Sequence, residues 1–156
     1  MVNTSVCGTD TRGFDSRRSP HFFIIMKFIS RSEKETIKIG EEIAKNGRLF
    51  IIKGPVGSGK TRIVKGIASH LGIKDEITSP TFGFKKNYEG LVHYDLYLAN
   101  SKIGKEFIAL INEELEDNYI AIEWGEKIPL KILNDYSLVT ININNDDERE
   151  IILEVK

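Results

Sequence analysis

The feature that most constrains this chain is a glycine-rich segment that separates an apolar run from a helical pattern. Residues 54–61, GPVGSGKT, match the pattern G-x-x-x-x-G-K-[ST] at every fixed position. The preceding residues 48–53, RLFIIK, carry a continuous apolar run of the kind found in buried parallel strands. Beyond the glycines, apolar residues recur at helical spacing as far as Gly72, a residue suited to end a helix. A strand, a phosphate-binding loop and a helix in this order predict an α/β fold.

The residue types in this loop suit the binding of a nucleotide's phosphates. Glycines let the backbone wrap so that several N–H groups point at phosphate oxygens, and the helix that follows adds its positive N-terminal end. Lys60 is expected to reach the β- and γ-phosphates, and the Thr61 hydroxyl to bind magnesium. The alternative is a chance glycine turn, which would match this pattern in about one chain of this length in a few hundred. The predicted nucleotide-binding residues are Gly57, Ser58, Gly59, Lys60 and Thr61.

The rest of the chain alternates predicted strands and helices. Ser32 and Glu35 form the S-x-x-E pattern of a capping box, which opens a helix that residues 46–47, Asn-Gly, end. The other predicted elements are a short strand, a strand pair with a tight turn, a helix, a buried strand and a final strand pair. The short strand is expected at 26–30, and the strand pair at 76–97 about the turn 89–90. The helix is expected at 102–116, the buried strand at 118–124, and the final strand pair at 137–155 about the turn 145–147. This succession predicts a three-layer α/β, P-loop NTPase-like domain with a mixed, mainly parallel central sheet.

The N-terminal segment differs from the rest of the chain. Residues 1–25 are polar and lack an apolar period, so they are expected to be a disordered leader. One folded P-loop domain is then expected over residues 26–156. A transit peptide is the alternative, because three arginines lie among the serines and threonines of the leader, although two aspartates argue against it.

Composition excludes several classes of protein. The 156 residues include 22 basic and 23 acidic side chains, so the net charge of −1 gives no general attraction to nucleic acid or to an anionic membrane. The single cysteine, Cys7, rules out an internal disulfide and a cysteine-based metal site. No apolar run approaches the roughly 18 residues that a membrane span requires. We therefore expect no membrane association and a cytoplasmic location.

Two acidic residues follow apolar strands, at the edge where ligands of an open α/β sheet bind. The run LVHYD ends in Asp95 and the run YIAIE ends in Glu123. Either residue alone could be a solvated charge at a strand end. Both are predicted to be catalytic and to bind magnesium with Thr61, because a P-loop needs acidic partners for the metal and for the attacking water. His93 is expected to pack against the sheet rather than to take part in catalysis.

The segment TSPTF, residues 78–82, is the third feature of interest. Pro80 forces Ser79 out of helical geometry, so Ser79 and Thr81 are expected on an exposed loop near the helix that follows the P-loop. Hydroxyl groups there could contact the γ-phosphate, as switch loops do, which makes Thr81 a candidate nucleotide-binding residue. The alternative is an ordinary turn.

Taken in order, the motifs GSGKT, SPTF, HYDLY and IEW resemble those of the TsaE family, the bacterial ATPases required for threonylcarbamoyl modification of tRNA adenosine. The resemblance extends from about Lys27 to the C-terminus. It implies that Gly57 to Thr61 bind the phosphates of ATP or ADP, that Thr61 binds Mg²⁺, and that Asp95 and Glu123 are the family's acidic residues. It further implies nucleotide contacts for Thr36, Trp124 and Arg149.

The same resemblance implies slow, magnesium-dependent hydrolysis of ATP. The family acts on the TsaB–TsaD complex that transfers the threonylcarbamoyl group, so TsaB and TsaD are the expected partners and tRNA is contacted only indirectly. The chain departs from the family at three places. Leu98 stands where an arginine usually follows DLY, residues 101–117 lack the usual EEL…G signature, and Arg62 replaces a common second threonine.

Two other functions remain open from the sequence. A small-molecule P-loop kinase shares the loop and the sheet, but kinases commonly place several arginines on a closing lid. This chain has only Arg149 after Arg62, and no lid-like insertion between Asp95 and Glu123. A non-catalytic, ATP-sensing interaction module would bind nucleotide and a partner without releasing phosphate.

Overall fold

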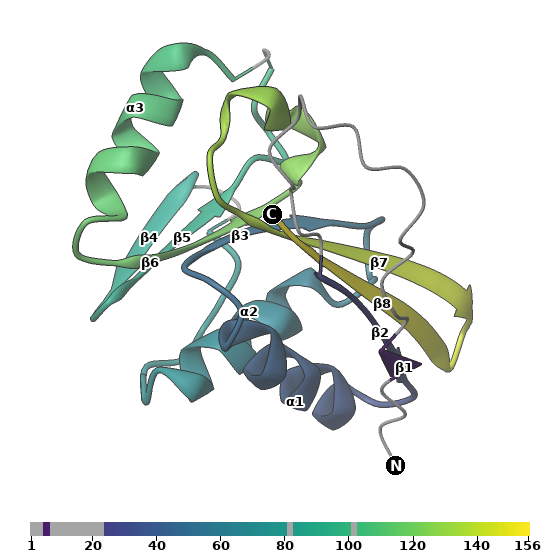
Figure 1. Ribbon diagram of the computed structural model, residues 1–156. Helices are drawn as coiled ribbons and strands as arrows, with labels where there is room; N and C mark the ends of the chain where they lie inside the picture. The colour runs from purple at the N-terminus through teal and green to yellow at the C-terminus, as the bar shows by residue number, and fades with distance from the viewer. Residues whose placement is uncertain (1–4, 7–23, 81–82, 101–102) are drawn as a thin grey trace.

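The computed structural model describes residues 5–6, 24–80, 83–100 and 103–156, and the structural statements below concern these residues. They form one mixed sheet with helices on both faces (Figure 1). Across the sheet the strands lie in the order β1-β2-β8-β7-β3-β6-β5-β4. Their bounds are β1 Ser5–Val6, β2 Ile24–Ser30, β3 Leu49–Lys53, β4 Lys85–Tyr88, β5 Leu91–Asp95, β6 Tyr119–Glu123, β7 Ser137–Asn145 and β8 Glu148–Val155.

The central strands β7, β3, β6 and β5 run parallel to one another, whereas the flanking strands pair antiparallel. β3 and β6 are buried along nearly their whole length, as expected for parallel strands that are covered on both faces. β7 begins with alternating buried and half-buried residues, the pattern of a strand with one better-covered face. The predicted α/β fold, with a mixed sheet and a parallel centre, is confirmed.

Helices form the two outer layers of the described fold. They are α1 Glu33–Ala44, α2 Lys60–His70 and α3 Lys105–Glu114, with the short 3-10 helices η1 Gly125–Lys127 and η2 Leu130–Ile132. α1 and α2 lie together on one face of the sheet, and α3 lies on the other (Figure 1). The three predicted layers are therefore confirmed. Among the described residues, no helix has both the length and the apolar character needed to cross a lipid bilayer.

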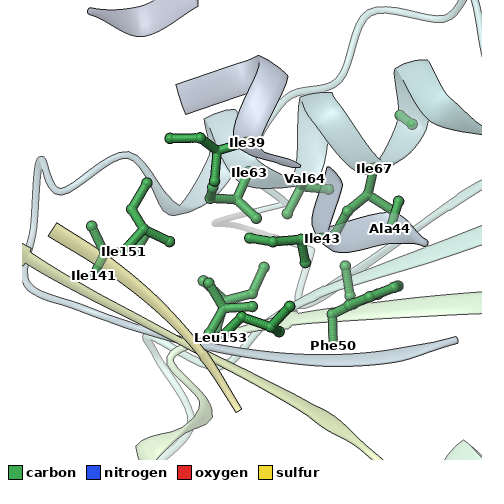
Figure 2. Packing of buried hydrophobic residues seen from close by; sticks show 14 of the residues in the cluster. Ile39, Ile43, Ala44, Phe50, Ile63, Val64, Ile67, Ile141, Ile151 and Leu153 are labelled. Carbon is green, nitrogen blue, oxygen red and sulfur yellow. The ribbon is translucent and has the colours of Figure 1, made fainter. Parts of the chain in front are cut away.

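The core that supports the loop after β3 lies between the sheet and the α1–α2 layer (Figure 2). Its side chains come from α1, α2 and the seven strands β2 to β8, and burying them holds α2 in a fixed place over the sheet. Labelled members in the figure include Ile39, Ile43, Ile63, Val64, Ile67, Phe50, Ile141, Ile151 and Leu153.

α1 and α2 cross at two glycines that let the helix backbones almost touch. A Cβ atom on Gly66 would lie 2.1 Å from the carbonyl oxygen of Ile37, and one on Gly40 would lie 2.5 Å from that of Ile63. Neither distance leaves room for a side chain. The close crossing brings α1 against the helix that follows the glycine-rich loop.

The local signals for turns and caps agree with the structure. Ser32 caps α1 by accepting a hydrogen bond from the Glu35 N–H at 3.1 Å. The predicted turn between β4 and β5 contains Gly90 at φ +79°, and the turn between β7 and β8 lies at residues 146–147. Gly72 follows α2 at φ +74°, the conformation expected of a residue that ends a helix.

The bounds of several elements differ from the predictions. The strand pair expected over 76–97 is shorter, since β4 covers Lys85–Tyr88, β5 covers Leu91–Asp95, and residues 76–80, which include Pro80, are not in a strand. α1 ends at Ala44, two residues before the Asn-Gly pair, and α3 covers 105–114 instead of 102–116. Gly104, at the start of α3, makes no side-chain cap hydrogen bond, so no local signal marks that end. β2 begins at Ile24 rather than at residue 26, because Ile24 and Ile25 pair with β8.

The expected leader, residues 1–25, lies mostly outside the described residues. Ser5 and Val6 form β1 and pair antiparallel with Met26 and Lys27 of β2. With Ile24 and Ile25, these are the residues of the segment that the structure places in the sheet. The assignment of the rest to a disordered leader remains a prediction.

Candidate nucleotide-binding site

The glycine-rich loop runs from the end of β3 to the first residue of α2, as the sequence predicts. Gly54, Gly57 and Gly59 have φ angles of +155°, +75° and +103°, which residues with a side chain rarely adopt. A Cβ on Gly54 would also lie 2.7 Å from the Ser58 hydroxyl. Gly59 provides no side-chain cap, so the first N–H groups of α2 remain available to an anion.

Lys60 lies within this loop and is 5% exposed. Its ammonium donates hydrogen bonds to the carbonyl oxygens of Gly54 at 2.7 Å and Pro55 at 2.8 Å. Burial lowers the pKa of Lys60, while the carboxylates of Glu123, Glu126 and Asp95 act in the opposite direction. The loop therefore holds a desolvated cation beside the positive end of α2.

Thr61 and Glu123 meet at the end of β6. The Thr61 hydroxyl donates a hydrogen bond to Glu123 Oε1 at 2.8 Å, and the Glu123 side chain is buried. An ionised carboxylate only accepts hydrogen bonds, so the threonine proton is engaged and its oxygen lone pairs are left for another ligand. The structure thus brings together two residues that lie 62 positions apart in the chain.

Asp95 lies next to Glu123, because the two are Cα partners in the parallel pair of β5 and β6. Ser79 donates to Asp95 Oδ2 at 2.5 Å, and the N–H of Tyr97 donates to Oδ1 at 2.9 Å. Ser79 is half-buried rather than exposed, because it reaches this carboxylate. Thr81 lies outside the described residues.

A cleft of about 320 Å³ joins these groups on one side of the loop. Its lining includes Lys60, Thr61, Ser79, Asp95, Glu123 and Trp124. The predicted acidic residues and the predicted phosphate-binding residues therefore face one space. This arrangement can hold a polyanion at the loop and a hard cation or a water molecule at the carboxylates.

Thr36 and Arg149 lie on the other side of the loop, beside a second cleft of about 360 Å³. Arg149 donates to the carbonyl oxygens of Asn145 and Asp146 and, at 3.4 Å, to that of Gly57. This links the turn between β7 and β8 to the P-loop. Thr36 is buried and donates to the carbonyl oxygen of Ser32 at 3.1 Å. Both residues thus lie next to the P-loop glycines and outside the cleft that contains Asp95 and Glu123.

Two residues that differ from the motifs of the TsaE family, Arg62 and Leu98, lie at the rim of the site. Arg62 forms an ion pair with Glu33 of α1 and lines both clefts. Leu98 is 58% exposed, in the segment after Asp95. Neither residue obstructs the loop, since both clefts remain open beside it.

The sequence did not identify three residues that shape the site. His93 Nε2 lies 2.9 Å from Glu123 Oε1, so the histidine packs in the sheet, as expected, but also contacts an acidic site residue. Glu126 accepts a hydrogen bond from the Gly54 N–H at 3.2 Å. Lys127 donates to three carbonyl oxygens of the segment after β5, those of Leu96, Tyr97 and Ala99, at 2.6, 2.8 and 2.8 Å. The spacing of His93 and Asp95, two apart on one strand, was the only available signal.

Comparison with known proteins gives a consistent result. The family model of the threonylcarbamoyl adenosine biosynthesis protein TsaE matches residues 30–151. The tRNA threonylcarbamoyladenosine biosynthesis protein TsaE of Treponema pallidum is 32% identical over 134 residues, which cover 81% of this chain and 98% of that protein. The proteins of the same name from Aquifex aeolicus and Bacillus subtilis are 34% and 31% identical. They cover 67% and 76% of this chain and 80% and 76% of their own lengths.

A solved structure shares the fold. The crystal structure of YdiB from Bacillus subtilis superposes with a TM-score of 0.67 and 24% sequence identity, covering 86% of this chain and 88% of that one. At this identity the likeness supports the architecture of the sheet and its helices.

Proposed function

This chain belongs to the TsaE family of threonylcarbamoyl adenosine biosynthesis proteins, and from that premise we propose that it is a P-loop ATPase that slowly hydrolyses ATP in support of tRNA threonylcarbamoylation. The observation that carries the proposal is the hydrogen bond from the Thr61 hydroxyl to Glu123. It joins the phosphate-binding loop to a buried acidic residue. A loop that only bound phosphate would need no such partner.

The phosphates of ATP are proposed to bind the free N–H groups of α2 and the Lys60 ammonium. Lys60 would exchange the carbonyl oxygens of Gly54 and Pro55 for phosphate oxygens, which carry negative charge and accept stronger hydrogen bonds. Burial lowers the pKa of Lys60, and the negative charge of the phosphates favours the protonated form of this lysine. Nucleotide binding therefore offsets the desolvation of the Lys60 ammonium in the free site.

Magnesium fits the oxygen atoms of Thr61, Asp95 and Glu123, which are the hard ligands that this ion prefers. The described residues contain no group of three or more histidine, cysteine, aspartate or glutamate side chains arranged to bind a metal by themselves. This agrees with an ion that takes most of its ligands from phosphate and water. When bound, magnesium would neutralise charge on the phosphates.

Asp95 and Glu123 are proposed to orient the water that attacks the γ-phosphorus. In that step a new bond from water to phosphorus forms, the bond from phosphorus to the ADP oxygen breaks, and one proton of the water passes to the carboxylate that orients it. Both oxygens of Asp95 already accept hydrogen bonds, from Ser79 and Tyr97. Each of these oxygens can accept a further hydrogen bond, so the two donors can hold Asp95 in place while it binds water or magnesium.

TsaB and TsaD are the proposed partners, and the surface around the cleft is suited to a protein contact. Val56 and Tyr97 line the cleft and are 71% and 49% exposed, and Leu98 follows Tyr97. The Tyr97 ring lies 4.9 Å from the ring of Trp124, which in turn contacts Lys60. A partner that touched Tyr97 would be linked to the phosphate-binding lysine through Tyr97 and Trp124. The net charge of −1 agrees with only indirect contact to tRNA, and the cytoplasmic location stays a prediction.

Phosphate release in the presence of TsaB and TsaD tests the proposal. Supplied with ATP and Mg²⁺, the complex should release inorganic phosphate, and a pull-down of TsaB and TsaD should depend on ATP. Nucleotide-dependent capture of the partners without phosphate release would identify a non-catalytic ATP sensor. A phosphorylated small metabolite in place of free phosphate would identify a kinase.

A further inference from the structure

His93 is a fully buried histidine that the proposed reaction does not use. It lies on β5 between Leu91 and Asp95, and because side chains alternate along a strand, these three residues share one face of the sheet. That face is the one covered by α1 and α2. A buried polar ring at this place needs a partner, and Nε2 has one, Glu123 Oε1, at 2.9 Å.

Oε1 of Glu123 is the meeting point of three elements. It lies 2.8 Å from the Thr61 hydroxyl of α2 and 2.9 Å from the His93 ring of β5, and Glu123 itself ends β6. Among the described residues, both side-chain hydrogen bonds of this carboxylate go to Oε1. The second oxygen, Oε2, is thereby left for the contents of the cleft.

The ring of His93 has one tautomer that suits these surroundings. A carboxylate offers only lone pairs, so Nε2 must carry a proton to make the bond. The other ring nitrogen, Nδ1, is buried and has no hydrogen-bond partner among the described residues. A proton on Nε2 leaves Nδ1 with only a lone pair, whereas the opposite tautomer would bury an unpaired N–H and set two lone pairs against each other. Of the two tautomers, the one with its proton on Nε2 is therefore the one that fits.

We propose that His93 is a positioning residue that fixes the Glu123 carboxylate for catalysis. Held at Oε1 by His93 and Thr61, the carboxylate keeps Oε2 turned to the cleft, where the proposed function needs it to orient magnesium-bound or attacking water. Without His93, the Glu123 carboxylate would have Thr61 as its one side-chain donor and could rotate about the bond that joins it to the side chain. The inference rests on the proposed ATP hydrolysis.

A purely structural role for His93 is less consistent with its surroundings. The backbones of β5 and β6 already pair in register at His93 with Ala121 and at Asp95 with Glu123. The strand alignment therefore does not depend on the ring. Leu91 fills the neighbouring position on the same face with an apolar side chain, so an aliphatic residue at position 93 would satisfy packing and would avoid burying an unpaired nitrogen.

Two substitutions separate these roles by kinetics. His93→Leu fills the space without a donor, whereas His93→Gln offers an amide N–H that can reach Glu123. Outer-shell partners of metal-site ligands typically contribute about 10–100-fold in activity, so His93→Leu should lower kcat for phosphate release with TsaB and TsaD by about 10-fold or more. Its affinity for ADP without magnesium should stay within about 2-fold, because the P-loop contacts are intact. His93→Gln should recover most of the lost kcat.

The exposed histidine at the end of α2 provides the matched control, since His70→Leu removes the same ring far from the carboxylates. Full kcat in His93→Leu would overturn the inference. Equal losses in His93→Leu and His93→Gln, together with an equally lowered melting temperature, would show a structural residue instead.

A spectroscopic measurement keeps the inference testable if turnover is not observed. In the parental chain, the ¹⁵N spectrum of labelled histidine should show His93 with its proton on Nε2, and Glu123→Gln should shift that Nε2–H resonance. Absence of phosphate release from the parental complex would refute the proposed function. The positioning role depends on the contact between His93 Nε2 and Glu123 Oε1. A spectrum of the other tautomer, or an Nε2–H resonance that does not change in Glu123→Gln, would refute that contact.

Discussion

The Lys60 ammonium lies 3.9 Å from the centre of the Trp124 ring, so the P-loop cation rests against the residue that follows Glu123. Trp124 holds this place with φ +60° and ψ +42°, a left-handed backbone that bulky residues rarely adopt. Gly125 then passes close to the sheet, where a Cβ would lie 2.2 Å from Ile51 Cγ2. Contacts of a cation with an aromatic ring contribute about 0.5–2 kcal/mol. The lysine, the indole and the end of β6 form one unit that nucleotide binding must disturb.

Tryptophan fluorescence should therefore report nucleotide binding, because Trp124 is the only tryptophan in the chain. Phosphate would draw Lys60 from its carbonyl partners and change the charge next to the indole. The expected result is a change in emission that saturates with ATP or ADP. Lys60→Ala should show no such response. A saturable change of equal size in that variant would mean that the signal comes from another event.

Lys60→Ala should weaken ATP binding severely. The substitution removes the buried ammonium of the loop, and a hydrogen bond to a charged group contributes about 1.5–3 kcal/mol, which corresponds to about 10–100-fold in affinity. Lys65→Ala, on the exposed side of α2, removes the same charge from the same helix and should bind ATP as the parental chain does. Calorimetry is the measurement, and an unchanged affinity in Lys60→Ala would place the phosphate site elsewhere.

Asp95→Ala and Glu123→Ala should lower hydrolysis far more than ATP binding. Phosphate affinity comes from the loop N–H groups and Lys60, which both changes leave in place, whereas the carboxylates act on magnesium and water in the transition state. Loss of a negative charge beside a polyanion could even tighten ATP binding. Phosphate release should be followed with TsaB and TsaD present. Parental rates in both variants would contradict the catalytic assignment and favour the ATP-sensing module.

Gly66→Ala should destabilise the protein through the helix crossing. The new Cβ would meet the Ile37 carbonyl at 2.1 Å, so α1 and α2 would have to move apart. Overpacking of this kind costs about 1–3 kcal/mol. Urea unfolding gives the measurement, with Lys65→Ala on the exposed part of α2 as the comparison. An unchanged unfolding midpoint in Gly66→Ala would show that the helices separate without strain.

Removal of the N-terminal segment should have a small effect that depends on where the cut is made. Deleting residues 1–23 removes the two-residue edge strand β1 but leaves β2 whole, and it should change neither the melting temperature nor nucleotide affinity appreciably. Deleting residues 1–25 also removes Ile24 and Ile25, which pair with β8 but are 47% and 41% exposed. A decrease of a few degrees is expected for that cut. A large decrease in melting temperature after the shorter deletion would show that residues 1–23 contribute substantially to the stability of the domain.

Much of the fold could be predicted from sequence because its signals are local. The glycines of the P-loop, the capping Ser32 and the turn at Gly90 each act within a few residues through backbone geometry. The apolar runs of β5 and β6 indicate buried parallel strands, and the acidic residue at the end of each run led to Asp95 and Glu123. Element ends were less predictable: β2 starts where its partner β8 ends, which no local pattern records.

The contacts that make these residues a site come from the tertiary structure alone. The strand order places β5 beside β6 and so sets Asp95 next to Glu123. The bond between Arg149 and Gly57 spans 92 residues, and the bond between His93 and Glu123 spans 30. Sequence periodicity determines which face of a strand or helix a residue occupies. Which faces meet depends on the crossover connections and on strand register, and these are decided only when the whole core packs.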